Sequence, residues 1–250
     1  MTFRTHKMIL NANETDTGNP ATATISASAP ACKHYFPCTE TAAPITDIAA
    51  AGGNLNTGLT VADQGDGSLA FVTGVTGGGY SATIAEPGSN DFIVGCVFTV
   101  LHANNKMYVQ FGAAAAGYYR VHQDAGTIAA TMDDGSTALA ASSTKVFVIG
   151  ETHCMAAVRD GLNLRLILDG VELESIAISA AFAASFAANA IADELWLGAI
   201  IAGSGQACWG FFDYIFEDGL PNNYIQLLAD IKTNLAANNK ILPAGLISLE

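Results

Sequence analysis

Two carboxylates near the C-terminal end are the first residues of this 250-residue chain whose types and spacing suggest chemistry. Asp213 and Glu217 lie in the run Phe-Asp-Tyr-Ile-Phe-Glu, at a spacing that places them on one face of a strand. Glycoside hydrolases use two carboxylates roughly 5 to 9.5 Å apart, whereas four residues along a strand separate these two by about 13 Å. We therefore predict no glycosidase. Asp213 is expected to hydrogen-bond within a late strand, and Glu217 with Asp218 to form a polar turn before a helix.

The histidines and cysteines show no spacing typical of metal ligands. No His-x-x-x-His or Cys-x-x-Cys pair occurs in the chain. His153 and Cys154 are adjacent, and adjacent residues of a strand point to opposite faces, which rules out a catalytic dyad. The sequence therefore predicts no catalytic, cofactor-binding or metal-ligating residue among the five histidines, His6, His34, His102, His122 and His153.

An acidic turn at Asp133 and Asp134 allows two interpretations. Carboxylates beside Gly135 and Ser136 offer oxygen ligands of the kind that calcium prefers. The same four residues also suit a β-hairpin, because Asp, Gly and Ser favour tight-turn geometry. We favour the turn and expect no cofactor, with calcium as the alternative.

Aromatic side chains in two short runs are of the kind that stack on sugar rings. Alternating aromatics in a β-sandwich more often pack in the core or at an interface, so sugar binding is the alternative interpretation of these residues. The glycine run at 77–79 lacks the Lys-Ser/Thr pair and the helix start of a phosphate loop, and we interpret it as a turn. The aromatic candidates are Tyr118, Tyr119, Trp209, Phe211 and Phe212.

The cysteines are odd in number and have no repeated spacing, so they indicate reduced thiols rather than a disulfide framework. Cys32 and Cys38 are close enough in sequence to pair, and that pairing is left open. Cys96 and Cys154 are expected to pack as small hydrophobic residues. The fifth cysteine is Cys208.

The charge balance excludes whole classes of protein. The chain has 10 Lys and Arg against 23 Asp and Glu, a net charge of −13, whereas nucleic-acid binding needs a basic surface. With 50% hydrophobic and 13% charged residues, the composition excludes disorder and favours a subunit of an oligomer or of a larger assembly. The Ala- and Ser-rich stretch 176–192 is too weakly apolar for a membrane span, and the apolar run 8–10 is too short for a signal peptide. We expect synthesis in the cytoplasm.

The elements that must position these residues are mostly short strands. Apolar runs separated by Gly, Asn or Asp recur about every 8 to 12 residues, as in antiparallel sandwiches and barrels. One helix is predicted from Pro221 to Ala236, where apolar residues recur at helical spacing. Strands are predicted at 69–75, 80–84, 91–101, 106–112, 117–122, 128–133, 145–150, 152–159, 163–168, 171–176, 194–199 and 209–217.

Two Asp-Gly turns predict a three-stranded meander from Thr152 to about Ile176. The pairs at 160–161 and 169–170 favour the positive φ angles that tight hairpins need. The alternation between them predicts an inward set, Met155, Ala157, Leu164, Leu166 and Leu168, and an outward set, Arg159, Asn163 and Arg165.

The two ends of the chain differ from this body. Residues 1–31 are rich in Thr, Ala, Asn and Ser without any period, and we expect an extended arm that lies on a neighbouring subunit. Residues 241–250 are apolar and are expected to dock on the body or on a partner. The predicted division is an arm at 1–32, a sandwich domain at 33–240 and a docking tail at 241–250.

Three motifs, in the same order, resemble laminin-G-like, concanavalin A-like lectin and glucanase domains. The central one, residues 153–171, contains His153 and both Asp-Gly turns, although Ile167 replaces the usual aromatic. Residues 195–198 and 209–217 resemble the closing strands of that family, and residues 35–40 and 46–55 its opening strand and turn.

Over about residues 33–236, this resemblance implies an all-β fold: a two-sheet antiparallel jelly-roll sandwich with one C-terminal helix, here preceded by the extended N-terminal arm. Laminarinase-type members of the superfamily carry the acidic motif E-x-D-x-(x)-E on one strand. Phe211 stands in place of its first acid, which again argues against an enzyme.

This fold does not decide the function, because lectins, glucanases, adhesion modules and viral structural domains share it. The sparse charge, the arm and the tail resemble virion proteins of tailed bacteriophages, such as capsid decoration, head-fibre or tail components. We therefore predict a non-enzymatic virion protein whose partners are copies of itself, as a homotrimer, and other virion proteins. The alternative is a carbohydrate-binding, receptor-recognising module for host surface glycans. Neither nucleic acid nor a membrane span is expected.

Overall fold

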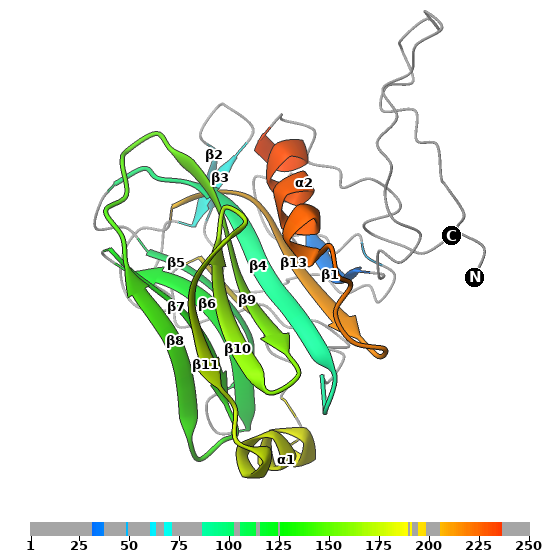
Figure 1. Ribbon diagram of the computed structural model, residues 1–250. Coiled ribbons are helices and arrows are strands. Elements are labelled where there is room, and N and C mark those ends of the chain that lie inside the picture. Colours follow the sequence, from blue (N-terminus) through cyan, green and yellow to red (C-terminus); the bar gives the residue numbers. More distant parts are fainter. Residues whose placement is uncertain are drawn as a thin grey trace, which may run out of the picture.

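A computed structural model of the chain describes residues 32–37, 49, 61–63, 68–71, 87–102, 106–113, 116–124, 126–189, 191, 195–198 and 206–236 (Figure 1). The predicted arm at 1–31, the predicted tail at 241–250, the glycine turn at 77–79 and the predicted strand at 80–84 lie outside these residues, as does Cys38.

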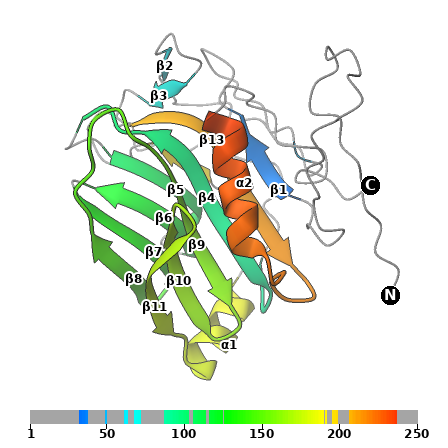
Figure 2. The same cartoon turned by 45° about the horizontal axis from the view of Figure 1, so that its top comes forward.

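Two antiparallel sheets pack face to face, which confirms the predicted all-β sandwich of jelly-roll type (Figures 1 and 2). The larger sheet has eight strands in the described part of the chain, and β1 (Cys32–Phe36) pairs with β13 (Ala207–Phe216) beside the main path. Its path runs through β11 (Val171–Ala177), β10 (Asn163–Leu168), β9 (Thr152–Asp160), β4 (Asp91–Thr99), β13 (Ala207–Phe216), β3 (Leu69–Phe71) and β2 (Val61–Asp63).

The smaller sheet has five strands among the described residues, each antiparallel to its neighbour. Apolar side chains from alternate positions of both sheets meet between them and form the main core. Its order is β12 (Leu195–Gly198), β5 (Lys106–Ala113), β6 (Gly117–Asp124), β7 (Thr127–Asp133) and β8 (Ala138–Thr144).

The predicted meander is confirmed in β9, β10 and β11. Asp169 and Gly170 have φ angles of 54° and 76°, as a two-residue type I′ turn requires, and Gly161 has 59°. The inward set is buried as predicted. The outward position of Arg159 is wrong, because it follows Met155 and Ala157 on the same side of β9. Its side chain is 3% exposed and donates from Nη1 to the Gly88 carbonyl at 3.0 Å.

The strand predicted at 145–150 is wrong as well. Residues 145–148 have no regular structure, and residues 149–150 form a turn. The strand lies just before them, in β8, whose Ala, Ser and Thr residues carry no apolar alternation. The run Val146–Ile149 attracted the prediction because it is apolar, but three of its four side chains are exposed.

The predicted C-terminal helix is confirmed as α2 (Tyr224–Ala236). A second helix, α1 (Ala180–Ala188), lies within the Ala-rich stretch, where no helix is expected from the sequence. The Ser179 hydroxyl caps it by accepting from the Phe182 amide at 3.1 Å, and Phe182 and Phe186 bury one face against the core. Neither described helix is long and apolar enough to cross a membrane.

Helix α2 lies across the outer face of the larger sheet, over β9, β4 and β13 (Figure 2). Its Leu228, Ile231 and Leu235 are at most 1% exposed and join a second apolar cluster with Cys154 and Val158. The larger sheet is therefore covered on both faces at β9, β4 and β13. No described helix covers the outer face of the smaller sheet.

Candidate functional site

The predicted roles of Asp213 and Glu217 are confirmed. Asp213 is fully buried, and its Oδ2 accepts a hydrogen bond from the Tyr119 hydroxyl at 2.9 Å across the core. Burial, followed by the negative charge of Asp213, raises the pKa of Tyr119 well above its usual value. Glu217 lies in the exposed turn after β13. These two carboxylates therefore form no catalytic pair.

His153 and Cys154 point to opposite faces of β9, as predicted. Cys154 packs under α2, and burial raises the pKa of its thiol strongly. His153 packs against Phe147, and its Nδ1 lies 2.7 Å from Oδ2 of Asp169. No dyad links the two neighbours.

Asp169 lies at the centre of a small polar network that connects three elements. Its Oδ1 accepts from the Cys154 amide of β9 at 2.9 Å and from Lys232 of α2 at 2.8 Å. Burial alone raises the pKa of Asp169, but the hydrogen bonds from His153, Lys232 and Cys154 outweigh it and lower the pKa to about 2. The network fixes the β10–β11 turn to β9 and to α2.

The acidic turn at 133–136 has the hydrogen bonding of a hairpin. Asp133 Oδ1 accepts from the Gly135 amide at 2.7 Å, and Asp134 Oδ1 accepts from the amides of Ser136 and Thr137. A hydrogen bond from Ser185 is the largest of the effects that lower the pKa of Asp134 to about 2. Among the described residues no three His, Cys, Asp or Glu side chains are grouped to hold a metal ion. Calcium stays an untested alternative.

The aromatic candidates are nearly all part of the interior. Tyr119, Phe211 and Phe212 are fully buried, and Trp209 is 6% exposed with its Nε1 donating to the Thr99 hydroxyl at 2.8 Å. Tyr118 differs because it points to the outer face of the smaller sheet. Cys32, Cys96, Cys154 and Cys208 are all buried.

Tyr118 belongs to a group of polar and aromatic side chains on that outer face, which we name the polar sheet face. The strand register places Gln110 opposite Arg120 and Tyr108 opposite His122, all on the side away from the core. Trp196 of β12 extends the group beyond Gln110. On the other side, β7 and β8 contribute only small or short side chains: Ala129, Thr131, Asp133, Ala138, Ala140 and Ser142.

The side chains of the polar sheet face hold one another in place. The Tyr108 and His122 rings stack with centroids 5.0 Å apart and planes 7° apart. The Arg120 guanidinium carbon lies 4.9 Å from the centre of the Tyr118 ring, and its Nη1 donates to Gln110 Oε1 at 3.3 Å. Cation–π and stacking contacts of this kind fix side chains before any ligand arrives.

The electrostatics of this face leave His122 neutral near pH 7. Burial, then the positive charge of Arg120, lowers its pKa to about 4. Burial and the charge of Asp124, which accepts from the Tyr108 hydroxyl at 3.2 Å, raise the pKa of Tyr108 to about 12. Within the part of the chain that the structure describes, His122 Nδ1 and Arg120 Nε are buried without a hydrogen-bond partner. Buried polar atoms of this kind call for a water or a ligand atom.

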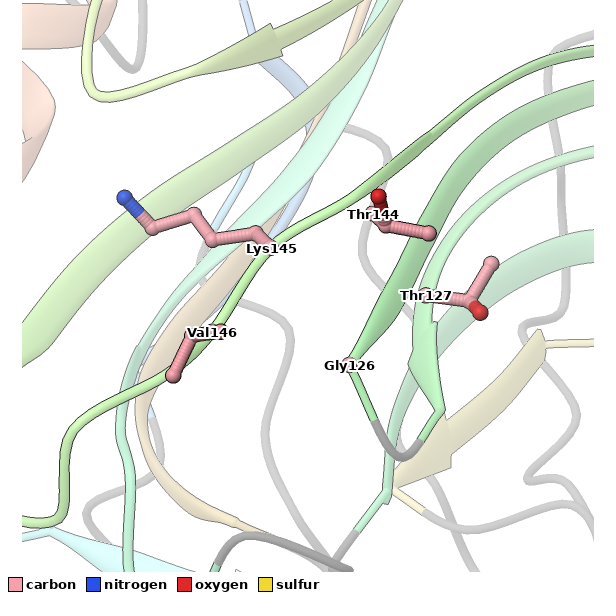
Figure 3. Close-up of a pocket in the computed structure, with 5 residues that line it drawn as sticks. All are labelled: Gly126, Thr127, Thr144, Lys145 and Val146. Carbon is pink, nitrogen blue, oxygen red and sulfur yellow. The ribbon is translucent and has the colours of Figure 1, made fainter.

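A pocket of about 310 Å³ opens at one end of the polar sheet face, between the β6–β7 turn and the chain that leaves β8. The register row Lys106, Asp124, Thr127 and Thr144 connects it to the stacked pair of Tyr108 and His122. Figure 3 shows Thr127 and Thr144 on one side of the opening and Lys145 and Val146 on the other. The pocket is therefore lined by a glycine, two threonines, a lysine and a valine, and the Lys145 ammonium points away from the two threonines.

Sequence reasoning identified one member of this site, Tyr118, and missed Tyr108, Arg120 and His122. The alternation within 117–124 carries the missing signal. Because Tyr119 and Val121 are apolar and inward, Tyr118, Arg120 and His122 must share the opposite face. The sequence does not show that Tyr108 and Gln110 join them, because that follows from the pairing of β5 with β6.

The comparisons with known proteins reach the level of fold. No family model matches the chain, and no curated protein matches it. The receptor-binding domain of botulinum neurotoxin C/D mosaic serotype superposes with a TM-score of 0.59 at 9% identity, over 82% of this chain and 51% of that one.

The type G receptor-binding domain gives 0.55 at 12% identity, over 83% and 51%. A structure of botulinum neurotoxin type C, whose cell entry is described as dependent upon interaction with two ganglioside molecules, gives 0.57 at 5% identity, over 85% and 52%. The chain thus spans about half the length of these similar structures, and the likeness shows a shared β-sandwich fold.

Proposed function

We propose that the chain is a non-catalytic, carbohydrate-binding recognition module, and that the polar sheet face contacts the sugar. The observation that carries this proposal is the cluster of Tyr108, Tyr118, Arg120 and His122, which is prearranged and has two buried polar atoms without a partner among the described residues. The similar toxin domains, one of them from a toxin described with gangliosides, support the same class of ligand.

The chemistry of this face suits a polyhydroxylated ligand. Tyr108 and Tyr118 are each 6% exposed, so their packed rings form a rigid floor rather than free stacking platforms. Arg120, His122 and Asp124 are more exposed and present donors and acceptors above that floor. A neutral imidazole both donates and accepts, as sugar hydroxyls do. The small residues of β7 and β8 leave room beside them.

The virion role predicted from the sequence depends on the arm and the tail, which lie outside the described residues. The similar structures concern toxin receptor recognition. Glycan recognition is therefore the function we carry forward, and the homotrimer and the virion partners stay predictions.

Glycan-array screening of the full chain, followed by calorimetry with the best glycan, tests the proposal. Arg120→Ala and His122→Ala should each weaken binding about 10- to 100-fold, because each removes hydrogen bonds to a buried polar ligand group. Arg165→Ala is the matched control, because Arg165 is a half-exposed arginine on the larger sheet that pairs with Asp160 at 2.7 Å. A blank array with folded protein, or equal loss in the control, contradicts the proposal.

A further inference from the structure

Exposed aliphatic side chains gather at one end of the sandwich. Val146 is 87% exposed, Val148 55% and Ile149 63%, and we name these three residues the aliphatic crest. Val171, 60% exposed, starts β11 at the same end. Of the exposed large hydrophobic residues in the described ranges, only Leu162 lies elsewhere. It follows β9 at the opposite end, about 30 Å away along nine strand residues.

The crest is held in a fixed shape. Between its exposed side chains, Phe147 is 7% exposed and packs with its ring centre 6.0 Å from that of Phe98. The amide of Lys145 donates to the Gly126 carbonyl, and that of Gly150 to the Val100 carbonyl, both at 2.8 Å. A crest pinned at both ends and in the middle presents its aliphatic side chains without a further ordering cost on binding.

The crest lies at the end of the sandwich where β2 and β3 also lie. The connection from β8 to β9 that carries it arches over the end of the sandwich in Figures 1 and 2. The β10–β11 turn lies at the same end, since the Asp169 amide donates to the Cys154 carbonyl at 2.8 Å.

A polar pocket lies directly beside the crest. Val146 belongs to both, as it lines the pocket of Thr127, Thr144 and Lys145 and is also the most exposed aliphatic residue. Aliphatic side chains that project next to a hollow lined by two threonines match an amphiphile, with its apolar part against the crest and its headgroup in the pocket.

We infer that this end of the sandwich docks on the surface of a lipid bilayer, with the aliphatic crest at the acyl boundary and a lipid headgroup in the pocket. Three side chains on one connection offer much less than the roughly 800 Å² per partner of a stable protein interface. The net charge of −13 disfavours an anionic surface, so the bilayer that fits is zwitterionic. This lipid contact does not depend on sugar binding.

One part of the inference rests on the proposed function and deepens it. The polar sheet face begins one register row from the pocket, so a sugar bound at Tyr108 and His122 lies close to the bilayer surface. The glycan is then the headgroup of a membrane glycolipid rather than a free polysaccharide.

Vesicle co-sedimentation of the full chain tests the lipid contact. The probe is phosphatidylcholine vesicles, with and without the glycolipid that carries the best array glycan. The triple variant Val146→Ser, Val148→Ser, Ile149→Ser should lower the partition coefficient on plain vesicles by about tenfold or more. Leu162→Ser, an exposed aliphatic at the opposite end, should leave it unchanged. Thermal melting checks that both variants fold.

The outcomes separate the two proposals. Arg120→Ala should keep the binding to plain vesicles and lose the increment from the glycolipid, whereas the crest variant should keep its affinity for the soluble glycan. If no glycan binds but the crest-dependent partition persists, only the proposed function fails. The lipid inference is overturned if wild-type protein does not sediment with plain vesicles, if Leu162→Ser matches the crest variant, or if light scattering shows that the crest instead mediates self-association.

Discussion

The outer faces of the two sheets differ although the sheets belong to one sandwich. On the larger sheet, α2 covers Cys154, Val158 and their neighbours with Leu228 and Ile231, and the part of the face under α2 is apolar and closed. On the smaller sheet, the corresponding face carries Tyr108, Arg120 and His122, with no described helix over it. One outer face therefore contributes to stability through apolar packing, whereas the other presents polar side chains. Substitutions on the two faces should therefore fail in different ways.

The largest effect is expected under α2. Ile231→Ala removes a fully buried side chain from the second apolar cluster and should lower the free energy of unfolding by about 2 to 5 kcal/mol. Urea denaturation measures it. Ser142→Ala, an exposed change on the other face, should stay within about 0.5 kcal/mol. Similar losses at the two positions would remove the contrast between the faces.

A smaller loss is expected within the larger sheet at Gly95. A methyl group there would lie 2.5 Å from the Met155 carbonyl oxygen and 2.7 Å from the Phe212 ring, and backbone cannot give way cheaply. Gly95→Ala should lower the free energy of unfolding by about 1 to 3 kcal/mol in the same denaturation assay. Glycan binding should be kept under conditions where the variant is folded. An unchanged midpoint would mean that β4 and β9 are less tightly paired than described.

On the outer face of the smaller sheet, the titration of His122 should make stability depend on pH. Its pKa falls from 6.5 to about 4 on folding, so the unfolded chain binds the proton more readily. The stability that this residue contributes is present above pH 6.5 and is lost as the pH falls toward 4. Partial exposure reduces the effect to about 1 to 2 kcal/mol. His122→Gln should flatten the stability profile in that window, and an unchanged slope would contradict the assignment.

The covered side should respond at lower pH, through Asp169. Its pKa falls from 3.8 to about 2 on folding, so its contribution is present above pH 3.8 and is lost as the pH approaches 2. Asp169→Asn should cost about 1 kcal/mol at neutral pH, and the difference from wild type should vanish near pH 2. A constant difference across denaturation curves from pH 7 to pH 2 would show that the carboxylate charge does not matter.

The sequence predicts those parts of the fold in which buried apolar residues recur with the period of a strand or a helix. β9 and β10 alternate visibly between their Asp-Gly turns, and α2 repeats apolar residues at helical spacing. β8 consists mostly of Ala, Ser and Thr and shows no apolar alternation. α1 is rich in Ala, which favours a helix, but only Phe182 and Phe186 mark its buried face, so its apolar period is too short to be recognised. Val146–Ile149 misled the prediction because an apolar run looks the same whether its side chains are buried or exposed.

The candidate site depends on pairing that is not local. Tyr118 is recognisable as an aromatic residue, but the stack of Tyr108 on His122 exists only because β5 and β6 pair in one register. A shift of one residue between the strands would turn one of the two side chains to the opposite face and break the stack. The lowered pKa of His122 likewise comes from burial and from Arg120, which no spacing along the chain reveals.

The Asp169 network also links the motions of distant segments. Lys232 of α2 and the Cys154 amide of β9 share one carboxylate oxygen, so α2 cannot lift from the sheet without loosening the β10–β11 turn. In native-state hydrogen exchange, these elements should open as one cooperative unit. The exchange rate of the Cys154 amide then reports on the docking of α2, because both are hydrogen-bonded to Asp169.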